Sequence, residues 1–293
     1  MPTLTVDRQE IQVKNLQKVF WPDEGFTKAD IMNYYVRIWP YLAPHLKDRP
    51  LSLVRYPHGI AGGYFYQKDC PDAPDYVETT DIASEDRQIR YSMANNLPTL
   101  LWAVNLGSIE VHPWLSTNAD LDSPTYVIFD LDPMAPATYA DGVRVALALK
   151  KLTDELGLTL YPKVSGATGL HLYLPIAPGY NFKQTSTFVK RLGEAVIKTF
   201  PDLATNERRV ADRSGKVYLD HLQNIRGKTI ASVYSVRPFT GAPVSMPVTW
   251  AELPGTHPAS FTLQNALARA EQAGDLFADL LMKKQNLPQN LLE

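Results

Sequence analysis

Cysteine is nearly absent from this sequence of 293 residues, and long apolar runs are absent altogether. The single cysteine, Cys70, can form neither an internal disulfide nor a thiolate zinc cage, which excludes stapled secreted domains and zinc fingers. The longest apolar stretches, such as Leu100–Val104, hold about five residues, against the roughly 18 that span a bilayer. The first residues show no basic start followed by an apolar segment, so no signal peptide is expected. We therefore expect a reduced, cytoplasmic protein with no membrane partner.

Charge is nearly balanced overall, at −2, but it is unevenly distributed. Residues 183–237 carry eleven Lys and Arg against five Asp and Glu, a local charge of +6, and the remainder sums to −8. This asymmetry is typical of a polyanion-binding face on an otherwise acidic protein. A solvated helix face beside a basic loop would give the same numbers, so charge alone leaves both interpretations open.

Apolar periodicity predicts alternating strands and helices, and therefore an α/β layer structure. The expected strands are 3–13, 51–56, 64–68, 76–82, 87–91, 125–131, 159–165, 169–175, 216–220 and 229–236. The expected helices are one that begins after the capping sequence Thr27–Asp30 and is closed by Pro40 and Pro44, and others near 98–106, 138–157, 182–199 and 262–284. A boundary near residue 117 divides one module, 1–293, into an N-terminal subdomain, 1–117, and a catalytic core, 118–293.

Two aspartates end an apolar strand at Asp130 and Asp132. Strand periodicity places residues i and i+2 on one face, so the two carboxylates repel each other there. A hard divalent cation bound by carboxylate oxygens would relieve this repulsion. A strand that simply ends in two solvated aspartates is the structural alternative.

A second apolar strand ends in Asp220. Together with Asp130 and Asp132 it would complete a three-carboxylate cluster able to hold two Mg²⁺ or Mn²⁺ ions about 3.5–4 Å apart, an arrangement suited to in-line attack on a phosphate. Taken alone, Asp220 also fits an isolated aspartate at a strand end.

A glycine-containing loop, Ser165–His171, lies between two of the predicted strands. Its glycines permit a tight turn whose backbone N–H groups, together with the Ser165 hydroxyl, could wrap phosphates. His171 and Tyr173 alternate with leucines and would share the polar face that lines a cleft. A plain glycine-rich hairpin is the alternative.

Two further motifs resemble those of other enzyme classes but lack the spacing or the secondary structure that those classes require. Gly227–Thr229 resembles the end of a P-loop, but the first glycine that a P-loop requires would fall at Leu222. Phe129–Asp132 resembles the first motif of haloacid-dehalogenase-type phosphatases, and Gly274–Asp279 resembles their late acidic motif. That late sequence is expected inside a helix instead of at a strand end, which argues against a phosphatase.

The whole set of motifs resembles the archaeo-eukaryotic primase superfamily, and most closely the polymerase module of bacterial ligase D, which acts in non-homologous end joining. The resemblance covers nearly the full chain. Its matching segments are Lys18–Pro22, Thr27–Asp30, Arg55–Pro57, Tyr64–Lys68, Glu110–Trp114, Phe129–Pro133, Ser165–His171, Asp220–Asn224, Arg226–Thr229 and Arg237–Pro238. It implies a primase-type catalytic core of mixed and antiparallel sheets flanked by helices, in an α/β (α+β) fold.

The resemblance also implies a role for each matching residue. Asp130, Asp132 and Asp220 would ligate two catalytic ions, Mn²⁺ or Mg²⁺. The residues expected to contact or organise the bound nucleotide are His112, Ser165, His171, Gln223, Lys228 and Arg237. The residues expected to contact DNA are Asn15, Lys18 and Lys28 at a downstream 5′-phosphate, Phe65 and Tyr66 on template bases, and Arg213 in a loop that organises the template. The family often has two phenylalanines where this chain has Phe65 and Tyr66.

The implied function is a template-directed DNA/RNA polymerase that favours ribonucleotides, fills gaps and extends ends in double-strand-break repair. Its expected partners are DNA ends or a gapped duplex with a 5′-phosphate, NTP or dNTP, a Ku-type end-binding protein and a separate DNA ligase, near the nucleoid. A primase that starts chains de novo is the close alternative. A non-catalytic DNA-end-binding module and the phosphatase are alternatives of other classes.

Overall fold

The computed structural model describes residues 2–293, which divide into two compact units. The first unit holds residues 2–119, 229–245 and 261–274, and the second holds 120–228, 246–260 and 275–293. The chain first passes from one unit to the other after residue 119, close to the predicted boundary at 117. It then returns to the first unit twice, at residues 229 and 261. That the whole chain works as one polymerase module stays a prediction.

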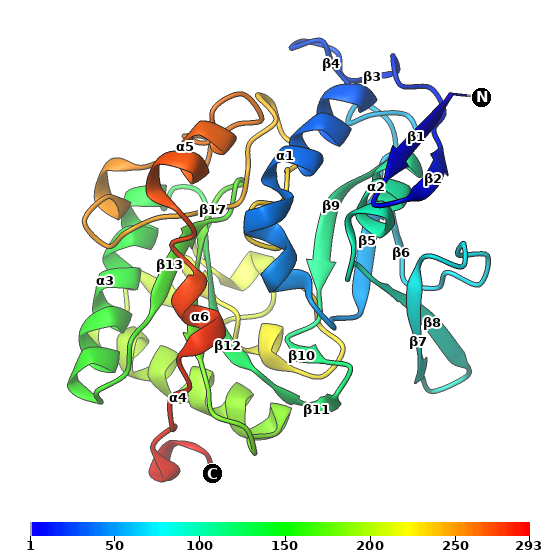
Figure 1. The fold of residues 1–293 in the computed structure, drawn as a ribbon. Helices are drawn as coiled ribbons and strands as arrows, with labels where there is room; N and C mark the ends of the chain where they lie inside the picture. Colours follow the sequence, from blue (N-terminus) through cyan, green and yellow to red (C-terminus); the bar gives the residue numbers. More distant parts are fainter. Residues whose placement is uncertain (1) are drawn as a thin grey trace. The chain divides into compact units, whose positions relative to one another are not determined.

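The second unit contains a six-stranded sheet in the order β15–β16–β12–β14–β13–β17. Three of its strands, β12, β13 and β17, are labelled in Figure 1. All its neighbouring pairs are antiparallel except β15 with β16. Its strands are β12 (Tyr126–Pro133), β13 (Tyr161–Val164), β14 (Leu170–Pro175), β15 (Ala204–Thr205), β16 (Val217–Leu219) and β17 (Met246–Pro247). The unit also contains β11 (Asp120–Pro124), α3 (Tyr139–Glu155), α4 (Phe182–Thr199), α6 (Ala278–Met282) and the 3-10 turns η1 (Val210–Asp212), η2 (His221–Asn224), η3 (Leu253–Gly255) and η4 (Gln289–Leu291).

The two faces of β12 differ in chemistry because successive side chains point in opposite directions. Phe129 lies on the face that packs against α4, where its ring meets that of Phe188. Asp130 and Asp132 lie on the opposite face, together with Tyr126, whose ring meets that of Tyr173 in β14. The first face anchors the sheet under α3 and α4, and the opposite face carries the two aspartates at the end of β12.

A three-stranded antiparallel sheet, β6–β5–β9, lies in the first unit. Its strands are β5 (Leu51–Arg55), β6 (Phe65–Gln67) and β9 (Ser108–Pro113), and every residue of β9 is buried. Around it lie β1 (Thr3–Val6), β2 (Gln9–Gln12), β3 (Val19–Trp21), β4 (Phe26–Thr27), β7 (Glu78–Ala83), β8 (Gln88–Met93), β10 (Ser116–Thr117), α1 (Lys28–Leu46), α2 (Leu97–Asn105) and α5 (Ala266–Ala273). Within residues 2–293, no helix is both long and apolar enough to cross a bilayer.

The first helix differs from its prediction at the C-terminal end. The capping box at Thr27 begins it as predicted, but α1 continues through Pro40 and Pro44 to Leu46. A proline inside a helix costs about 3 kcal/mol because it removes a backbone hydrogen bond. Packing outweighs this cost here, since Ile38 and Leu42 are fully buried along the same stretch.

Three other predicted elements are wrong in form. The expected strand 3–13 is a hairpin of β1 and β2, because Asp7 and Arg8 adopt positive φ between them. The expected strand 229–236 makes only isolated bridges, and Tyr234 within it has φ 64°. The expected helix 262–284 is broken by Gly274, whose φ of 69° ends α5. The acidic sequence after Gly274 therefore lies at the start of α6, not inside one long helix.

Candidate active site

Strand register places the three predicted metal ligands on one face of the sheet in the second unit. In the β12–β16 pair, Leu131 lies opposite Leu219 and Asp132 opposite Tyr218, so the next position sets Asp130 opposite Asp220. The backbone N–H of Asp220 donates to the carbonyl of Asp130 at 3.2 Å, which continues the pairing. Directly opposite residues of an antiparallel pair share a face, so Asp220 joins the face of Asp130 and Asp132.

The carboxylate of Asp220 forms hydrogen bonds with residues next to it in the chain. Its Oδ1 accepts the backbone N–H of Leu222 at 2.9 Å and the hydroxyl of Tyr218 at 3.2 Å. Burial and the neighbouring carboxylate of Asp220 raise the pKa of Tyr218 to about 12, so its hydroxyl stays protonated and donates. Among residues 2–293 no three His, Cys, Asp or Glu side chains are already arranged as a metal site. The metal assignment therefore stays a prediction, now with a shared face to support it.

The same register extends across the sheet through His171 to a lysine that the sequence analysis did not single out. Asp130 lies opposite His171, and His171 lies opposite Lys163 in β13. The Nε2 of His171 is 3.3 Å from the Asp130 Oδ1. Lys163 is 0% exposed, with its Nζ 5.7 Å from the ring centre of Tyr173. The row thus has two acidic residues, Asp220 and Asp130, at one end and two basic residues, His171 and Lys163, at the other.

The loop Ser165–His171 is folded around the hydroxyl of Ser165. This oxygen accepts the backbone N–H groups of Ala167 and Gly169, each at 3.1 Å. Gly169 approaches β12 so closely that a Cβ there would lie 2.1 Å from the carbonyl oxygen of Leu131 and 3.3 Å from Asp132 Oδ1. The glycine is therefore required to bring the loop beside the aspartates.

Side chains around Asp220 hold its turn in place. Arg213 stacks on Tyr218, with its guanidinium carbon 3.6 Å from the ring centre. Gln223 is buried in η2. Asn224, also in η2, exchanges two hydrogen bonds with the backbone of Ile128 in β12, accepting its N–H at 2.8 Å and donating to its carbonyl at 2.7 Å. The predicted Lys228 is exposed in the turn that follows.

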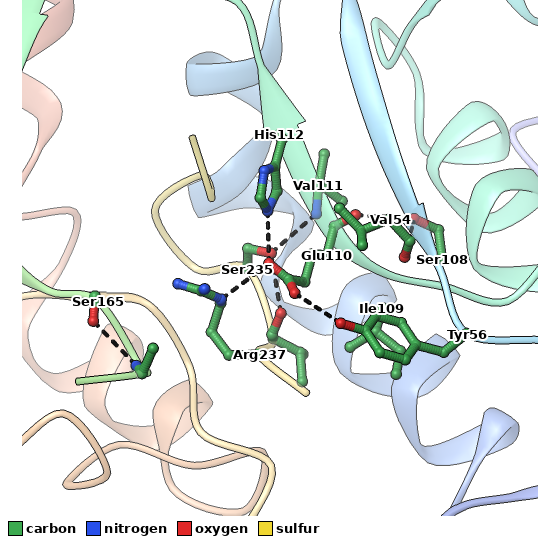
Figure 2. A network of polar contacts seen from close by, with 12 residues as sticks. Val54, Tyr56, Ser108, Ile109, Glu110, Val111, His112, Ser165, Ser235 and Arg237 are labelled. Atoms are coloured by element: carbon green, nitrogen blue, oxygen red, sulfur yellow. Dashed lines mark hydrogen bonds and ion pairs between the residues drawn. The ribbon is translucent and has the colours of Figure 1, made fainter. Parts of the chain in front are cut away.

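A buried polar network in the first unit joins His112 and Arg237 through a residue that had no predicted role, Glu110 (Figure 2). Its Oε2 lies 2.6 Å from His112 Nε2 and 3.0 Å from Arg237 Nε. The hydroxyl of Tyr56 donates to its Oε1 at 3.4 Å. Burial by itself raises the pKa of Glu110, but the His112 hydrogen bond and the charge of Arg237 outweigh it and lower that pKa below the usual value. Glu110 is therefore ionised at neutral pH.

Aromatic side chains stand exposed beside this network, on and next to β6. The side chains of Phe65 and Tyr66 are 46% and 57% exposed, so neither ring is packed into the core. The guanidinium of Arg55 lies 5.1 Å from the centre of the Phe65 ring. The Tyr66 ring meets His112 edge-on at 6.2 Å. Tyr64, which had no predicted role, stacks on Tyr56 at 5.2 Å and is exposed as well.

Asn15, Lys18 and Lys28 also lie together in the first unit. The backbone N–H of Lys18 donates to Asn15 and that of Lys28 donates to Lys18. Lys28 is buried, however, and its ammonium donates to the carbonyls of Lys14 and Asn105 at 2.9 and 2.7 Å. Burial, together with the charges of Lys18 and Arg55, lowers the pKa of Lys28. The cluster is cationic, but Lys28 is fixed by backbone oxygens.

Three residues that contact or neighbour the candidate site residues were not predicted from the sequence, for different reasons. Glu110 stood within a quoted motif, and its alternation with His112 was the available signal. Asn224 also stood in a motif, yet nothing local indicates that it bonds to a strand far back in the chain. Lys163 lies two residues before Ser165, and only the sheet register relates it to Asp130.

Comparison with known proteins identifies related sequences over nearly the whole chain. The family described as LigD, primase-polymerase domain, matches residues 27–277. The chain is 34% identical to the bifunctional non-homologous end joining protein LigD of Bacillus subtilis over 95% of its length, and 32% identical to the multifunctional LigD of Mycolicibacterium smegmatis over 93%. It spans 45% and 36% of those two proteins, less than half of either.

A solved structure matches the same extent of chain. The polymerase domain from Mycobacterium tuberculosis ligase D in complex with DNA superposes with a TM-score of 0.87 at 28% identity, covering 94% of this chain and 99% of that domain. The expected primase-type fold of mixed sheets and flanking helices is thereby confirmed, as is the expected family resemblance.

Proposed function

We propose, because this chain belongs to the LigD primase-polymerase domain family, that it fills gaps and extends ends of broken DNA under the direction of a template. Membership of a primase-polymerase family makes it a nucleotidyltransferase. The repair setting is our proposal, supported by relatives named as non-homologous end joining proteins. A preference for ribonucleotides over deoxyribonucleotides belongs to the same proposal.

The shared face of Asp130, Asp132 and Asp220 is the observation that carries the proposal. Carboxylate oxygens are the ligands that Mg²⁺ and Mn²⁺ prefer, so this donor set fits two such ions. When bound, the ions would supply charge stabilisation at the attacking and leaving oxygens of a phosphoryl transfer. The carboxylate of Asp220 would have to exchange its bonds to Leu222 and Tyr218 for such an ion.

Hydrogen-bonding and cationic groups in each of the two units are suited to a nucleoside triphosphate. We assign Ser165, His171, Gln223 and Lys228 to phosphate and nucleotide contacts in the second unit, and His112 with Arg237 to the same role in the first. Positive and hydrogen-bonding groups stabilise the negative charge that builds up on the departing pyrophosphate.

Groups in the first unit are suited to DNA. Exposed aromatic rings at Phe65 and Tyr66 offer faces on which unpaired template bases stack. We assign Asn15, Lys18 and Lys28 to a 5′-phosphate, with Lys28 contributing the positive charge of its buried ammonium, and Arg213 in the second unit to organising the template. A Ku-type end-binding protein and a separate DNA ligase are the partners that this activity would require.

The test is primer extension on a gapped duplex with a downstream 5′-phosphate, using NTPs and dNTPs, each with Mn²⁺ and Mg²⁺. We expect Asp130→Ala and Asp220→Ala to abolish nucleotide addition while leaving DNA binding within about twofold, because the carboxylates serve the metals. Asp122→Asn is the control, since Asp122 is an exposed aspartate in the same unit that pairs with Arg226. Full extension by either alanine variant would refute the metal assignment.

De novo priming is the second candidate, favoured by the primase-polymerase character of the family. Comparing gapped substrates with and without the 5′-phosphate separates the two. Tighter binding with the phosphate supports gap filling through the cluster of Asn15, Lys18 and Lys28. Equal binding, together with chain initiation on unprimed single strands, would support priming instead.

A further inference from the structure

The network around Glu110 offers a role that neither the sequence motifs nor the family comparison assigns. Glu110 is 5% exposed and lies in the middle of β9, a strand whose residues are all buried. An ionised carboxylate in such a place is unfavourable unless it is paired and hydrogen-bonded. Glu110 is both, because His112 and Arg237 meet it from two sides.

One carboxylate oxygen fixes two side chains that are far apart in the sequence. Oε2 of Glu110 engages Nε2 of His112 and the Nε of Arg237. An ionised Glu110 can only accept, so the Nε2 of His112 carries a proton and its other ring nitrogen, Nδ1, faces elsewhere. In Figure 2 the terminal nitrogens of Arg237 likewise project away from the carboxylate. His112 therefore has its Nδ1, and Arg237 its terminal nitrogens, directed away from Glu110.

The backbone does not depend on Glu110 for this arrangement. The Val111 N–H donates to the Ser235 hydroxyl at 3.1 Å, and the Ser232 N–H donates to the Val111 carbonyl at 2.9 Å. The Val236 N–H donates to the hydroxyl of Tyr35 at 3.2 Å. These bonds hold the segment that carries Arg237 against β9, so Glu110 orients side chains on an anchored frame.

We propose that Glu110 is a positioning residue for the incoming nucleotide. It orients the imidazole of His112 and the guanidinium of Arg237 so that their outward nitrogens meet the nucleotide together. This inference rests on the proposed function, in which both side chains contact the nucleotide. The proposal predicts that loss of Glu110 weakens the binding of nucleotide and leaves the binding of DNA intact.

The test uses Glu110→Gln, which keeps the shape of the side chain and removes its charge. We expect the KM for nucleotide to rise about tenfold, equivalent to about 1.4 kcal/mol, with kcat changed less and the Kd for gapped DNA within about twofold. Glu24→Gln is the matched control, because Glu24 accepts a hydrogen bond from the backbone N–H of Gly241 in the segment that also carries Arg237. A Glu110→Gln enzyme with an unchanged nucleotide KM would overturn the proposal.

Two measurements keep the test decisive if the variant folds poorly or the wild-type chain does not polymerise. Nitrogen-15 NMR of the wild-type His112 ring should show the neutral form protonated at Nε2, and a neutral form protonated at Nδ1 would overturn the inference. Calorimetric binding of a non-hydrolysable NTP to wild type and Glu110→Gln reports positioning without turnover. If wild type binds NTP more tightly than the variant but extends no primer, the proposed function fails and the positioning role stands.

Discussion

Replacement of Asn224 by alanine tests how the turn after β16 is held beside β12. Asn224 is 0% exposed and bonds both backbone groups of Ile128, which is itself fully buried. The substitution leaves a buried N–H and a buried carbonyl without their partner, and each such loss costs about 1–3 kcal/mol. We expect Asn224→Ala to lower the free energy of unfolding by about 3 kcal/mol, near the low end of the sum. Nucleotide addition should fall as well, because η2 continues directly from Asp220.

The assay is urea denaturation followed by circular dichroism, with amide hydrogen exchange at Ile128 as a local readout. Asn105→Ala is the matched control. Asn105 likewise accepts a backbone N–H, from Lys14 at 3.0 Å, and donates to a carbonyl, of Gln12 at 2.9 Å, but these bonds are solvent-exposed. Water replaces exposed bonds, so the control should lose less than about 1 kcal/mol. Equal losses in the two variants, or unchanged protection of Ile128, would refute the reasoning.

Three further experiments test other parts of the structure. Gly169→Ala should disrupt the Ser165 loop and abolish nucleotide addition, because its Cβ would meet the Leu131 carbonyl at 2.1 Å; a fully active variant would contradict that geometry. Lys28→Met should destabilise the fold by about 1–3 kcal/mol, because two part-buried carbonyls lose their donor. Lys18→Met removes a single donor, to the Pro57 carbonyl, and should mainly weaken binding of a 5′-phosphorylated gap, as denaturation and DNA titration would show. The lowered pKa of Glu110 means that its stabilising contribution is present above the unfolded pKa of about 4.3 and is lost as pH falls through the folded value. The stability difference between wild type and Glu110→Gln should therefore shrink on acidification below about pH 4, and a difference that stays constant down to pH 3 would contradict the ionised state.

Local patterns decided most of the elements that carry the candidate site. The strand that ends in Asp130 and Asp132 and the helix 182–199 follow from apolar periodicity and capping residues, which act over a few positions. The same patterns failed where distant packing competes with local preference. The proline-containing end of α1 remains helical because its apolar side is buried, and this burial is invisible in the local sequence.

The chemical identity of the candidate ligands is likewise a property of the sequence. Two aspartates at i and i+2, a third at another strand end and a glycine-containing loop with serine and histidine already indicated metal and phosphate chemistry. Gly169 shows the limit of that inference. Its presence suggested a tight turn, whereas the structure shows that it is needed for close approach to the Leu131 carbonyl.

Which groups face one another was decided only by tertiary structure. Register set Asp220 opposite Asp130 and placed Lys163 in the row of His171, and no periodicity within one strand contains that information. Glu110 gained its partner Arg237 from a segment more than a hundred residues later in the chain, held by backbone bonds to β9. The sequence determines which side chains are present, but which of them pair across strands and segments depends on the free energy of the whole packed unit.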